Sequence, residues 1–407
     1  MGGNVATVDD VESWRGIVGA AERFGTPFFA LWRKPFVQAV KRAQSVTGVA
    51  ESRHWYSYKS QPVPALARTA AELGLGVEVV SPFELFAAHR LGFAPSNILV
   101  NGLAKHSWLP NDVTNLNVIF DSLTEVHELA SVARRLEWRC GLRIAVTQQV
   151  NADEPRLATQ FGVDLDDAVR ATRILAAQGA DIDILHVHLR SNVPDISDYR
   201  AALAELRDVA SVAGLVPRVI DVGGGLPDRG LPTQSTVAST LTLGHLGDIA
   251  AAARAAFPYA NEIWFENGRA LLAPGGVLVV SILDIKERNG YRMLVCDGGR
   301  TNHALPSDWE THLVALARNP KGPAMIDTIV CGPTCMAFDS FYQGPFTTEA
   351  RIGDRIIYFN AGAYHIPWET RFSFGECRVL WTEDGLAIRE IRRAEQPEQW
   401  LARWTDL

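Results

Sequence analysis

"HWYSYKSQPVPALARTAAELG", residues 54–74, contains a strand pattern followed directly by a helix pattern. Its first half alternates aromatic and polar side chains and stops at Gln61-Pro62, as a half-buried strand does. Its second half repeats Ala and Leu at helical spacing. A strand followed by an amphipathic helix indicates a βα unit and therefore a parallel sheet. The strand also ends on Lys59, and the ammonium of a lone lysine ordinarily lies in water.

The same succession of strand and helix recurs along the first two thirds of the chain. The strand-like runs cover residues 54–60, 77–81, 98–102, 117–122, 143–149, 184–190, 218–225 and 262–268. Eight βα units over about 220 residues fit the size of a (β/α)8 TIM barrel. A doubly wound open sheet is the alternative, and the number of strands favours the barrel.

The pattern changes in the last third of the chain. Residues 276–407 lose most of the helical periodicity and contain strand-like runs joined by glycine, Asn-Gly and Asp-Gly turns. The run "TPFFALW", residues 26–32, looks like a strand without a partner in the barrel. The sequence therefore predicts an α/β protein with a barrel over residues 36–275. A β-rich domain over residues 1–35 and 276–407 would include the N-terminal strand.

Composition and charge limit the classes of partner. The 407 residues carry a formal net charge of −7 and no run of lysine or arginine, which argues against nucleic acid or an anionic membrane. No apolar run is long enough to span a bilayer, and the first residues lack the pattern of a signal peptide. Five cysteines in so long a chain form no disulfide framework, so we expect a cytoplasmic protein.

Candidate functional residues lie at the predicted strand ends, where TIM barrels carry their active sites. Lys59 follows the first strand, and His188 lies in the sixth. The residues after the seventh and eighth strands are Gly223, Gly224, Gly225, Glu266, Gly268 and Arg269. Glycine backbone N–H groups and an arginine together suit a phosphate, which often binds after these two strands. A glycine triplet alone is usually a tight turn. The prediction of a phosphate site therefore depends on the position of this triplet after the seventh strand.

Seven motifs in one order resemble the fold-type III pyridoxal-phosphate decarboxylases of ornithine, diaminopimelate and arginine. The motifs are "YSYKSQP", "VEVVSPFEL", "LHVHLRSN", "VIDVGGGLP", "FENGRALLAPGG", "CGPTCMAFD" and "GDRIIYFNAGAY", and the resemblance spans about residues 26 to 380. It implies pyridoxal 5'-phosphate as cofactor, bound covalently through the ε-amino group of Lys59. A free lysine, with a pKa of about 10.4, must be desolvated or placed near charge to act as a nucleophile.

The resemblance also assigns roles to other residues. Glu266 matches the glutamate that pairs with the pyridine nitrogen, and a carboxylate there makes the ring the strong electron sink that decarboxylation needs. His188 matches the histidine stacked on the ring, and Glu78 replaces the family's usual aspartate. Among the cofactor-binding residues, Ser191 would lie near the cofactor and Tyr364 would bind its phosphate.

Cys335 matches the family thiol that protonates Cα after carbon dioxide leaves, and it does so in the active site of the partner subunit. An unperturbed thiol, with a pKa of about 8.5, is mostly protonated at neutral pH and suits this role. The resemblance therefore implies a homodimer with shared active sites. The neighbouring Cys331 is separated from Cys335 by three residues, so the pair does not form a Cys-x-x-Cys redox motif.

Four departures from the family pattern bear on the substrate. Glu78 in place of aspartate is conservative, and the loop 298–309 lacks the Arg-Pro that diaminopimelate enzymes carry there. Met336 stands where the family places an acidic residue that holds the distal amine, and Arg190 replaces a glycine. We therefore expect an amino acid or amino-acid conjugate with a neutral or acidic distal group, as in siderophore or other secondary metabolism, with Arg190 as a candidate contact. The alternative is a basic amino acid of the diaminopimelate or ornithine type.

Other interpretations remain open. His186 and His188 could form half of a metal site, but no second ligand cluster at suitable spacing supports one, and we predict no metal. An amino-acid racemase is a second possibility, with Cys335 as its second base. A third is a non-catalytic regulator, although such a protein should have lost Lys59, Glu266 or Cys335. A small cofactor carrier of the same barrel fold would lack the C-terminal β-rich domain.

Overall fold

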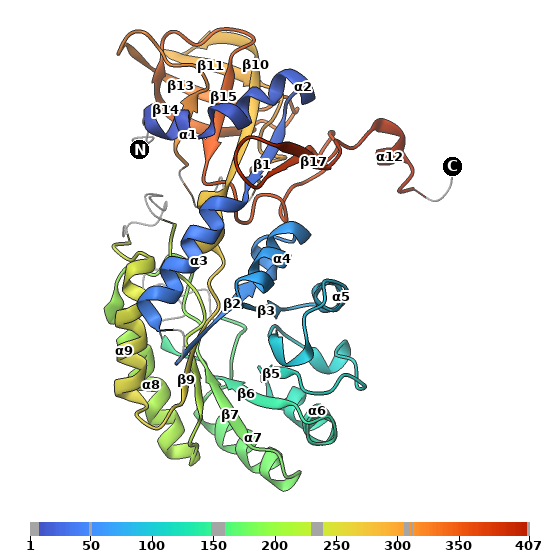
Figure 1. The fold of residues 1–407 in the computed structure, drawn as a ribbon, viewed down its shortest axis with the longest axis vertical. Coiled ribbons are helices and arrows are strands. Elements are labelled where there is room, and N and C mark those ends of the chain that lie inside the picture. Colours follow the sequence, from blue (N-terminus) through green and yellow to red (C-terminus); the bar gives the residue numbers. More distant parts are fainter. Residues whose placement is uncertain are drawn as a thin grey trace. The chain divides into compact units, whose positions relative to one another are not determined.

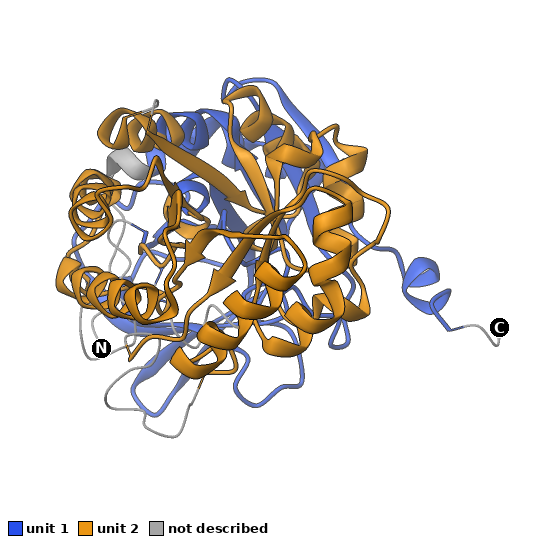
Figure 2. Ribbon diagram, turned by 90° about the horizontal axis from the view of Figure 1, so that it is seen from below, with its two compact units in different colours: residues 1–38, 228–238, 271–407 blue, residues 39–227, 239–270 orange. Residues whose placement is uncertain are grey.

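The structure is a computed structural model, and it describes residues 8–48, 51–147, 159–228, 239–304, 310 and 312–404 (Figure 1). It divides into two compact units, which Figure 2 shows in different colours. Unit 1 comprises Met1–Gln38, Asp228–Ala238 and Leu271–Leu407. Unit 2 comprises Ala39–Pro227 and Ser239–Ala270.

Unit 2 is a closed barrel of parallel strands, joined in sequence order from β2 to β9, with β9 paired to β2. The strands are β2 Ser52–Ser57, β3 Gly76–Val79, β4 Ile98–Val100, β5 Asn117–Phe120, β6 Arg139–Arg143, β7 Ile182–His186, β8 Val219–Asp221 and β9 Glu262–Phe265. The predicted (β/α)8 barrel is therefore confirmed. Parallel strands place all their carboxyl ends at one end of the barrel, where loops can present functional groups.

Helices surround these strands, as Figure 2 shows. They are α4 Pro64–Glu72, α5 Pro82–Arg90, α6 Leu123–Arg135, α7 Leu165–Ala177, α8 Ile196–Ala213 and α9 Leu246–Ala256, with α3 Arg33–Thr47 before the barrel and α10 Arg269–Leu272 after it. Short 3-10 turns are η1 Tyr58–Ser60, η2 Pro95–Asn97, η3 Lys105–Ser107, η5 Leu243–His245 and η6 Ala273–Gly275. The side chains of Ser81 and Ser122 cap α5 and α6 by accepting from the third backbone N–H of each helix.

Large side chains fill the barrel interior. Trp55 and Trp264 are fully buried with ring centroids 4.8 Å apart, and they belong to a cluster with Leu99, Ile119, Ile184 and Val219. Gly76 makes room for this packing, because a Cβ there would lie 2.3 Å from the ring of Trp55. The interior is therefore a packed core, as expected of an eight-stranded barrel.

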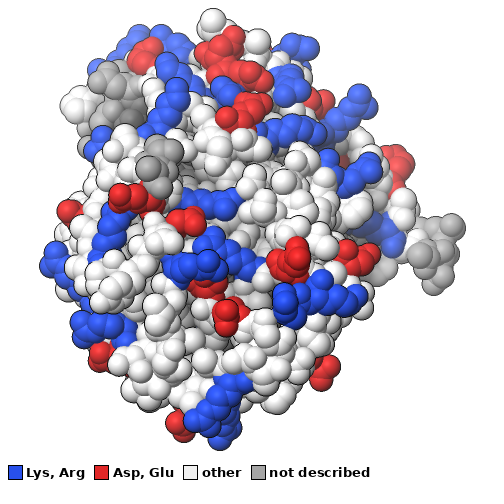
Figure 3. Space-filling view, turned by 60° about the horizontal axis from the view of Figure 1, so that its bottom comes forward, with Lys and Arg blue, Asp and Glu red and all other residues white. Residues whose placement is uncertain are grey.

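Ion pairs join several of the barrel strands. Asp183 of β7 pairs with Arg139 of β6 and with Arg218, the residue before β8. Arg139 also lies 3.3 Å from Glu262, which begins β9. On the face that Figure 3 draws, basic and acidic side chains are interspersed. The guanidinium groups of Arg139 and Arg218 are therefore paired with carboxylates of other barrel strands.

Unit 1 contains a nine-stranded sheet. Its strands are β1 Phe28–Trp32, β10 Gly276–Arg288, β11 Tyr291–Cys296, β12 Val314–Leu316, β13 Met325–Cys331, β14 Ser340–Thr347, β15 Arg355–Phe359, β16 Arg378–Thr382 and β17 Ile388–Arg392. The N-terminal strand β1 pairs antiparallel with β10 and parallel with β16, so its predicted place in the β-rich domain is confirmed. The helices of this unit are α1 Val8–Gly19, α2 Ala21–Phe24 and α12 Pro397–Leu401. No helix in the described parts of the chain is long and apolar enough to cross a membrane.

Candidate active site

Polar side chains gather at the carboxyl ends of the barrel strands. Lys59 lies in η1, directly after β2, and Glu266 directly follows β9. His188 was predicted inside a strand, and this detail is wrong because β7 ends at His186. The ladder continues only to Val187, whose N–H donates to the carbonyl oxygen of Asp221. His188 therefore belongs to the loop beyond the strand.

Lys59 is held by a buried carboxylate. Its Nζ donates to both oxygens of Glu78, at 2.6 and 2.7 Å, and Ser57 Oγ donates to the same carboxylate at 2.5 Å. Glu78 is fully buried, whereas the Lys59 side chain is 35% exposed. The ammonium is thus fixed at the end of the barrel, with part of its side chain still accessible to a ligand.

Glu266 is a buried carboxylate with one oxygen hydrogen-bonded and the other available. Oε1 accepts a hydrogen bond of 2.9 Å from Asn101 Nδ2, and His186 Nδ1 lies 3.5 Å from the same oxygen. Oε2 lies 3.6 Å from His188 Nδ1 and has no hydrogen-bond partner among the described residues. A buried acceptor of this kind costs free energy unless a donor reaches it, so the geometry suits a ligand N–H.

A second polar layer lies behind Glu266. His186 Nδ1 is 3.2 Å from Asp221 Oδ2, and both side chains are fully buried. Burial lowers the pKa of His186 to about 3 and raises the pKa of Asp221 to about 7. Burial also lowers the pKa of His188, against the opposing effect of Glu266. Both imidazoles are therefore neutral at neutral pH, and their planes are inclined by only 20°.

The glycine turn after β8 brings bare backbone close to these side chains. Gly223 has a φ of 64°, and its N–H donates to Asp221 Oδ1. Gly224 N–H donates to His188 Nδ1, and a Cβ on Gly224 would lie 2.5 Å from the carbonyl oxygen of Glu266. Gly225 also has a positive φ, of 99°. A side chain at any of these three positions would collide with neighbouring atoms of the protein.

Gly268 and Arg269 lie close to the turn that carries Lys59. A Cβ on Gly268 would lie 2.7 Å from Ser60 Oγ, in the same 3-10 turn as Lys59. Arg269 begins α10 and is 7% exposed. The structure thus brings the predicted residues of the first, seventh and eighth barrel strands to one end of the barrel unit.

The remaining predicted residues are placed differently. Ser191 is exposed, and the Arg190 guanidinium lies 3.0 Å from Asp198 of α8, so its charge is already compensated. Tyr364, Cys335 and Met336 belong to unit 1. There Cys335 is exposed and Met336 is half-buried. The ring of Tyr364 stacks on Trp368 with centroids 5.0 Å apart.

Three residues of the site were not predicted as functional. Asn101 holds Glu266, Asp221 contacts His186, and the buried Arg143 ends β6 at 3.8 Å from Asp121. Asn101 and Asp221 are polar residues at the carboxyl ends of apolar strands, and this position was the signal available in the sequence, whereas the strand that Arg143 ends contains a second arginine and a glycine. Glu266 also lies near both histidines of the His-x-His pair, so these three side chains are spaced as the ligands of a metal ion could be.

The residues at this end of the barrel fit pyridoxal phosphate. Lys59 supplies a fixed amine, and Glu266 supplies a buried carboxylate oxygen to which none of the described residues donates. The glycine turn brings backbone next to His188 and Glu266, at positions where a Cβ would collide with them. These are the three requirements of the cofactor: a covalent anchor, a partner for the pyridine nitrogen and a cradle for the phosphate.

Comparison with known proteins agrees with this fit. Residues 34–273 match the family model described as "Pyridoxal-dependent decarboxylase, pyridoxal binding domain". Diaminopimelate decarboxylase of Deinococcus radiodurans is 29% identical over 94% of this chain and 97% of its own length. The enzyme of Zymomonas mobilis is 25% identical over 94% and 95%.

Solved structures show the same fold. Diaminopimelate decarboxylase from Helicobacter pylori, complexed with L-lysine, superposes with a TM-score of 0.79 at 22% identity and covers 95% of this chain and 98% of its own. An arginine decarboxylase from Paramecium bursaria Chlorella virus superposes with a TM-score of 0.75 at 17% identity, over 90% of this chain and all of its own. With the family model matching more than half of its residues, the chain belongs to the pyridoxal-phosphate-dependent decarboxylases of fold type III, which are carboxy-lyases.

Proposed function

We propose that Lys59 anchors pyridoxal phosphate, that Glu266 accepts the N–H of its pyridine ring, and that the turn 223–225 binds its phosphate. When bound, the cofactor accepts the electron pair left at Cα as carbon dioxide departs. Glu266 keeps a proton on the pyridine nitrogen, and Asn101 fixes the orientation of the carboxylate. His188 lies beside Glu266 as a neutral ring, which suits stacking on an aromatic cofactor.

One observation carries this proposal: Oε2 of the buried Glu266 has no hydrogen-bond partner within the described part of the chain, and it lies at the same barrel end as the amine held by Glu78. Alanine racemases of similar fold have an arginine in place of the glutamate, so this carboxylate favours decarboxylation over racemisation. Cys335 is the proposed donor of the proton that replaces the carboxylate on Cα, acting in the partner subunit of a homodimer.

We propose a basic amino acid of the diaminopimelate or ornithine type as the first substrate to test. The relatives named above are diaminopimelate decarboxylases, and they match nearly the full length of the chain. This reverses the order of our sequence-based expectation, which placed a neutral or acidic distal group first. The pairing of Arg190 with Asp198 also weakens that expectation, because Arg190 was its candidate contact.

A conjugated amino acid with a neutral or acidic distal group is the second candidate. Met336 follows Cys335 at the position where the family carries an acidic residue for the distal amine. A thioether has no charge to hold an ammonium. This single substitution is the reason to include conjugates beside the free basic amino acids.

The test is a substrate panel. Purified protein, reconstituted with pyridoxal phosphate, is mixed with meso-diaminopimelate, ornithine, lysine, arginine and a set of amino-acid conjugates, and carbon dioxide release is followed by mass spectrometry. We expect release from one of the free basic amino acids and none from the Lys59→Ala variant. Turnover of a conjugate alone would select the second candidate. Loss of optical rotation without carbon dioxide would indicate a racemase, and a colourless, inert protein would indicate a regulator.

A further inference from the structure

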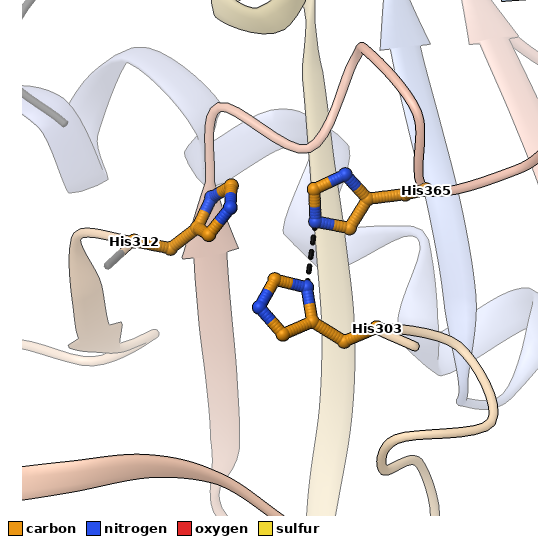
Figure 4. A group of neighbouring side chains, drawn as sticks. All are labelled: His303, His312 and His365. Atoms are coloured by element: carbon orange, nitrogen blue, oxygen red, sulfur yellow. Dashed lines mark hydrogen bonds between the residues drawn. The ribbon is translucent and has the colours of Figure 1, made fainter. Parts of the chain in front are cut away.

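Three buried histidines of unit 1 face one another (Figure 4). His303 lies in the turns after β11, His312 precedes β12, and His365 follows β15. Their exposed fractions are 1%, 3% and 0%. The three ring centroids form a nearly regular triangle with sides of 4.6, 4.7 and 4.8 Å. One ligand nitrogen from each ring lies within 4.8 Å of the others.

Two of the rings are oriented by backbone carbonyls. His365 Nδ1 lies 2.9 Å from the carbonyl oxygen of Ala363, and His312 Nδ1 lies 2.7 Å from that of Phe359. A carbonyl oxygen only accepts, so each Nδ1 carries the hydrogen in this arrangement. The lone pair of a neutral ring is then on Nε2. Metal-binding histidines are typically oriented in this way, with the second nitrogen donating to a carbonyl or carboxylate.

His303 completes the group through a short contact. Its Nδ1 is 2.6 Å from His365 Nε2, and it donates because Nε2 of His365 carries the lone pair. Two nitrogens bound to one zinc ion lie about 3.3 Å apart, given Zn–N distances of about 2.0–2.1 Å. A metal ion could thus replace the hydrogen shared by His303 and His365 if these two nitrogens moved apart by about 0.7 Å. The hydrogen would move to Nε2 of His303, so this pair of rings releases no proton.

A buried carboxylate lies next to the histidines. Glu310 is 4% exposed, and its Oε2 lies 3.0 Å from His312 Nε2. Because His312 Nδ1 already carries a hydrogen, this contact contains a further proton, on His312 Nε2 or on the carboxyl group, and a bound ion would displace it to solvent. The separation of the two atoms is close to that between two ligands of one tetrahedral ion. The carboxylate also provides negative charge in a place where a buried dication would otherwise be costly.

We propose that His303, His312 and His365 bind a divalent transition-metal ion, best matched by zinc, with Glu310 as the fourth ligand. Neutral imidazoles and a carboxylate are the donor set that zinc accepts in tetrahedral sites. A full set of four protein ligands in a buried position is typical of a structural site. The ion would join the connection between β11 and β12 to His365, which lies 62 positions after His303, and the proposal does not depend on the decarboxylase chemistry of the barrel.

The first test measures metal content. The reconstituted enzyme is stripped with a chelator, dialysed against zinc chloride and then against metal-free buffer, and its zinc is measured by mass spectrometry. We expect about one zinc per chain, as a four-ligand site would hold. The variants His303→Gln and His365→Gln should each lose zinc affinity by at least about tenfold. Circular dichroism checks that both variants are folded.

Two control variants locate the ion. His188→Gln removes a member of the other candidate group, which consists of His186, His188 and Glu266, and should leave the zinc content unchanged. His127→Gln removes an exposed histidine and controls for adventitious surface binding. Zinc lost in His188→Gln but kept in His303→Gln would overturn the proposal, as would a wild-type protein that retains no zinc.

A second measurement does not depend on the variants folding. Zinc added to the stripped wild-type enzyme should raise its unfolding temperature, and an equal concentration of magnesium should not, because an ion that binds only the folded state stabilises it. Absence of a zinc-specific shift would show that the three rings form a metal-free hydrogen-bonded cluster, which would contradict the proposal.

Discussion

At the scale of single residues, the position of Glu266 depends on Asn101. The amide is 3% exposed and donates to the carboxylate from the end of a different strand. We predict that Asn101→Ala lowers kcat about tenfold, because a hydrogen bond to a charged group is worth about 1.5–3 kcal/mol. Cofactor content, read from its visible absorption, and KM should change little.

Asn117→Ala provides the matched control for this prediction. Asn117 is also buried, but its amide donates to the backbone carbonyls of Ser96 and Ile98 rather than to Glu266. The control should lower the unfolding temperature and leave kcat unchanged. Equal kcat values for the Asn101 variant and wild type would show that Glu266 does not need this donor.

Asp221 makes stability depend on pH. Burial raises its pKa from 3.8 to about 7, with added repulsion from Glu78 and opposing effects of Gly223 N–H, Glu266 and Arg143. The folded protein therefore keeps a proton that the unfolded chain releases near pH 3.8. The contribution of Asp221 to the free energy of unfolding is therefore fully present below pH 3.8 and is lost as the pH rises towards about 7.

We predict that Asp221→Asn reduces the loss of stability between pH 5 and pH 7, by up to roughly 1.4 kcal/mol per pH unit. Asparagine retains an oxygen that can accept from Gly223 N–H. The measurement is urea unfolding at both pH values, with Asp208→Asn as the exposed control. A variant with the same pH slope as wild type would mean that Asp221 is ionised throughout this range.

The sequence identified only part of the site at this scale. Lys59 and Glu266 follow strands within recognisable motifs, so their positions could be inferred from local sequence. The contact between Asn101 and Glu266 joins residues 165 positions apart, and it exists only once the barrel has closed. The pairing of Arg190 with Asp198 likewise depends on how α8 begins, which residue type alone did not reveal.

At the scale of elements, the glycine turn after β8 is the segment most sensitive to substitution. Gly223 and Gly214 both have positive φ values, 64° and 69°. A Cβ on Gly223 would lie 2.6 Å from His188 Nδ1, whereas a Cβ on Gly214, at the end of α8, would meet nothing within 4 Å. Substitutions at both positions cost backbone strain, but only a side chain at Gly223 would also collide with His188. Comparing the two therefore distinguishes the two effects.

We predict that Gly214→Ala and Gly223→Ala both destabilise the protein, by about 1 kcal/mol from the positive φ alone. Only Gly223→Ala should also weaken binding of pyridoxal phosphate, by at least about tenfold, because its methyl group displaces His188. Titration of the stripped protein, followed by cofactor absorption, measures this difference. Equal cofactor affinities in the two variants would argue against the turn as the phosphate cradle.

Strand positions were predicted well where local chemistry is clear and poorly where it is not. The run 117–122 contains β5, and "DYRAALAELRDVASVAG" contains most of α8. The fifth barrel strand was expected at 143–149, but β6 spans Arg139–Arg143, and residues 148–149 lie outside the described part of the chain. Its sequence "RCGLR" has two arginines and a glycine, which are poor strand signals in isolation. Ion pairing of both arginines with carboxylates favours the strand.

At the scale of the whole molecule, the chain returns repeatedly to the sheet unit. β1 lies between β10 and β16, so residues near 30, 280 and 380 share one sheet. The sequence suggested this arrangement because "TPFFALW" had no partner in the barrel. It gave no indication that His303, His312 and His365 would meet, since their proximity depends on how the connection between β11 and β12 packs against the one between β15 and β16.

The last prediction concerns the assembly. Lys59 lies in the barrel unit and Cys335 in the sheet unit, and Cys335 is exposed within one chain. If Cys335 acts in the partner's active site, a dimer of one Lys59→Ala chain and one Cys335→Ala chain contains one intact site, built from the two unaltered residues. Random mixing of the two inactive variants should then restore about a quarter of wild-type activity, because half of the dimers are mixed and each has one working site of two.

The experiment mixes the two purified variants, allows the subunits to exchange, and measures carbon dioxide release with the substrate that the panel identifies. Each variant alone serves as the control and should remain inactive. Light scattering gives the oligomeric state before and after mixing. A mixture as inactive as its components, despite demonstrated exchange, would place Lys59 and Cys335 of the same chain in one active site.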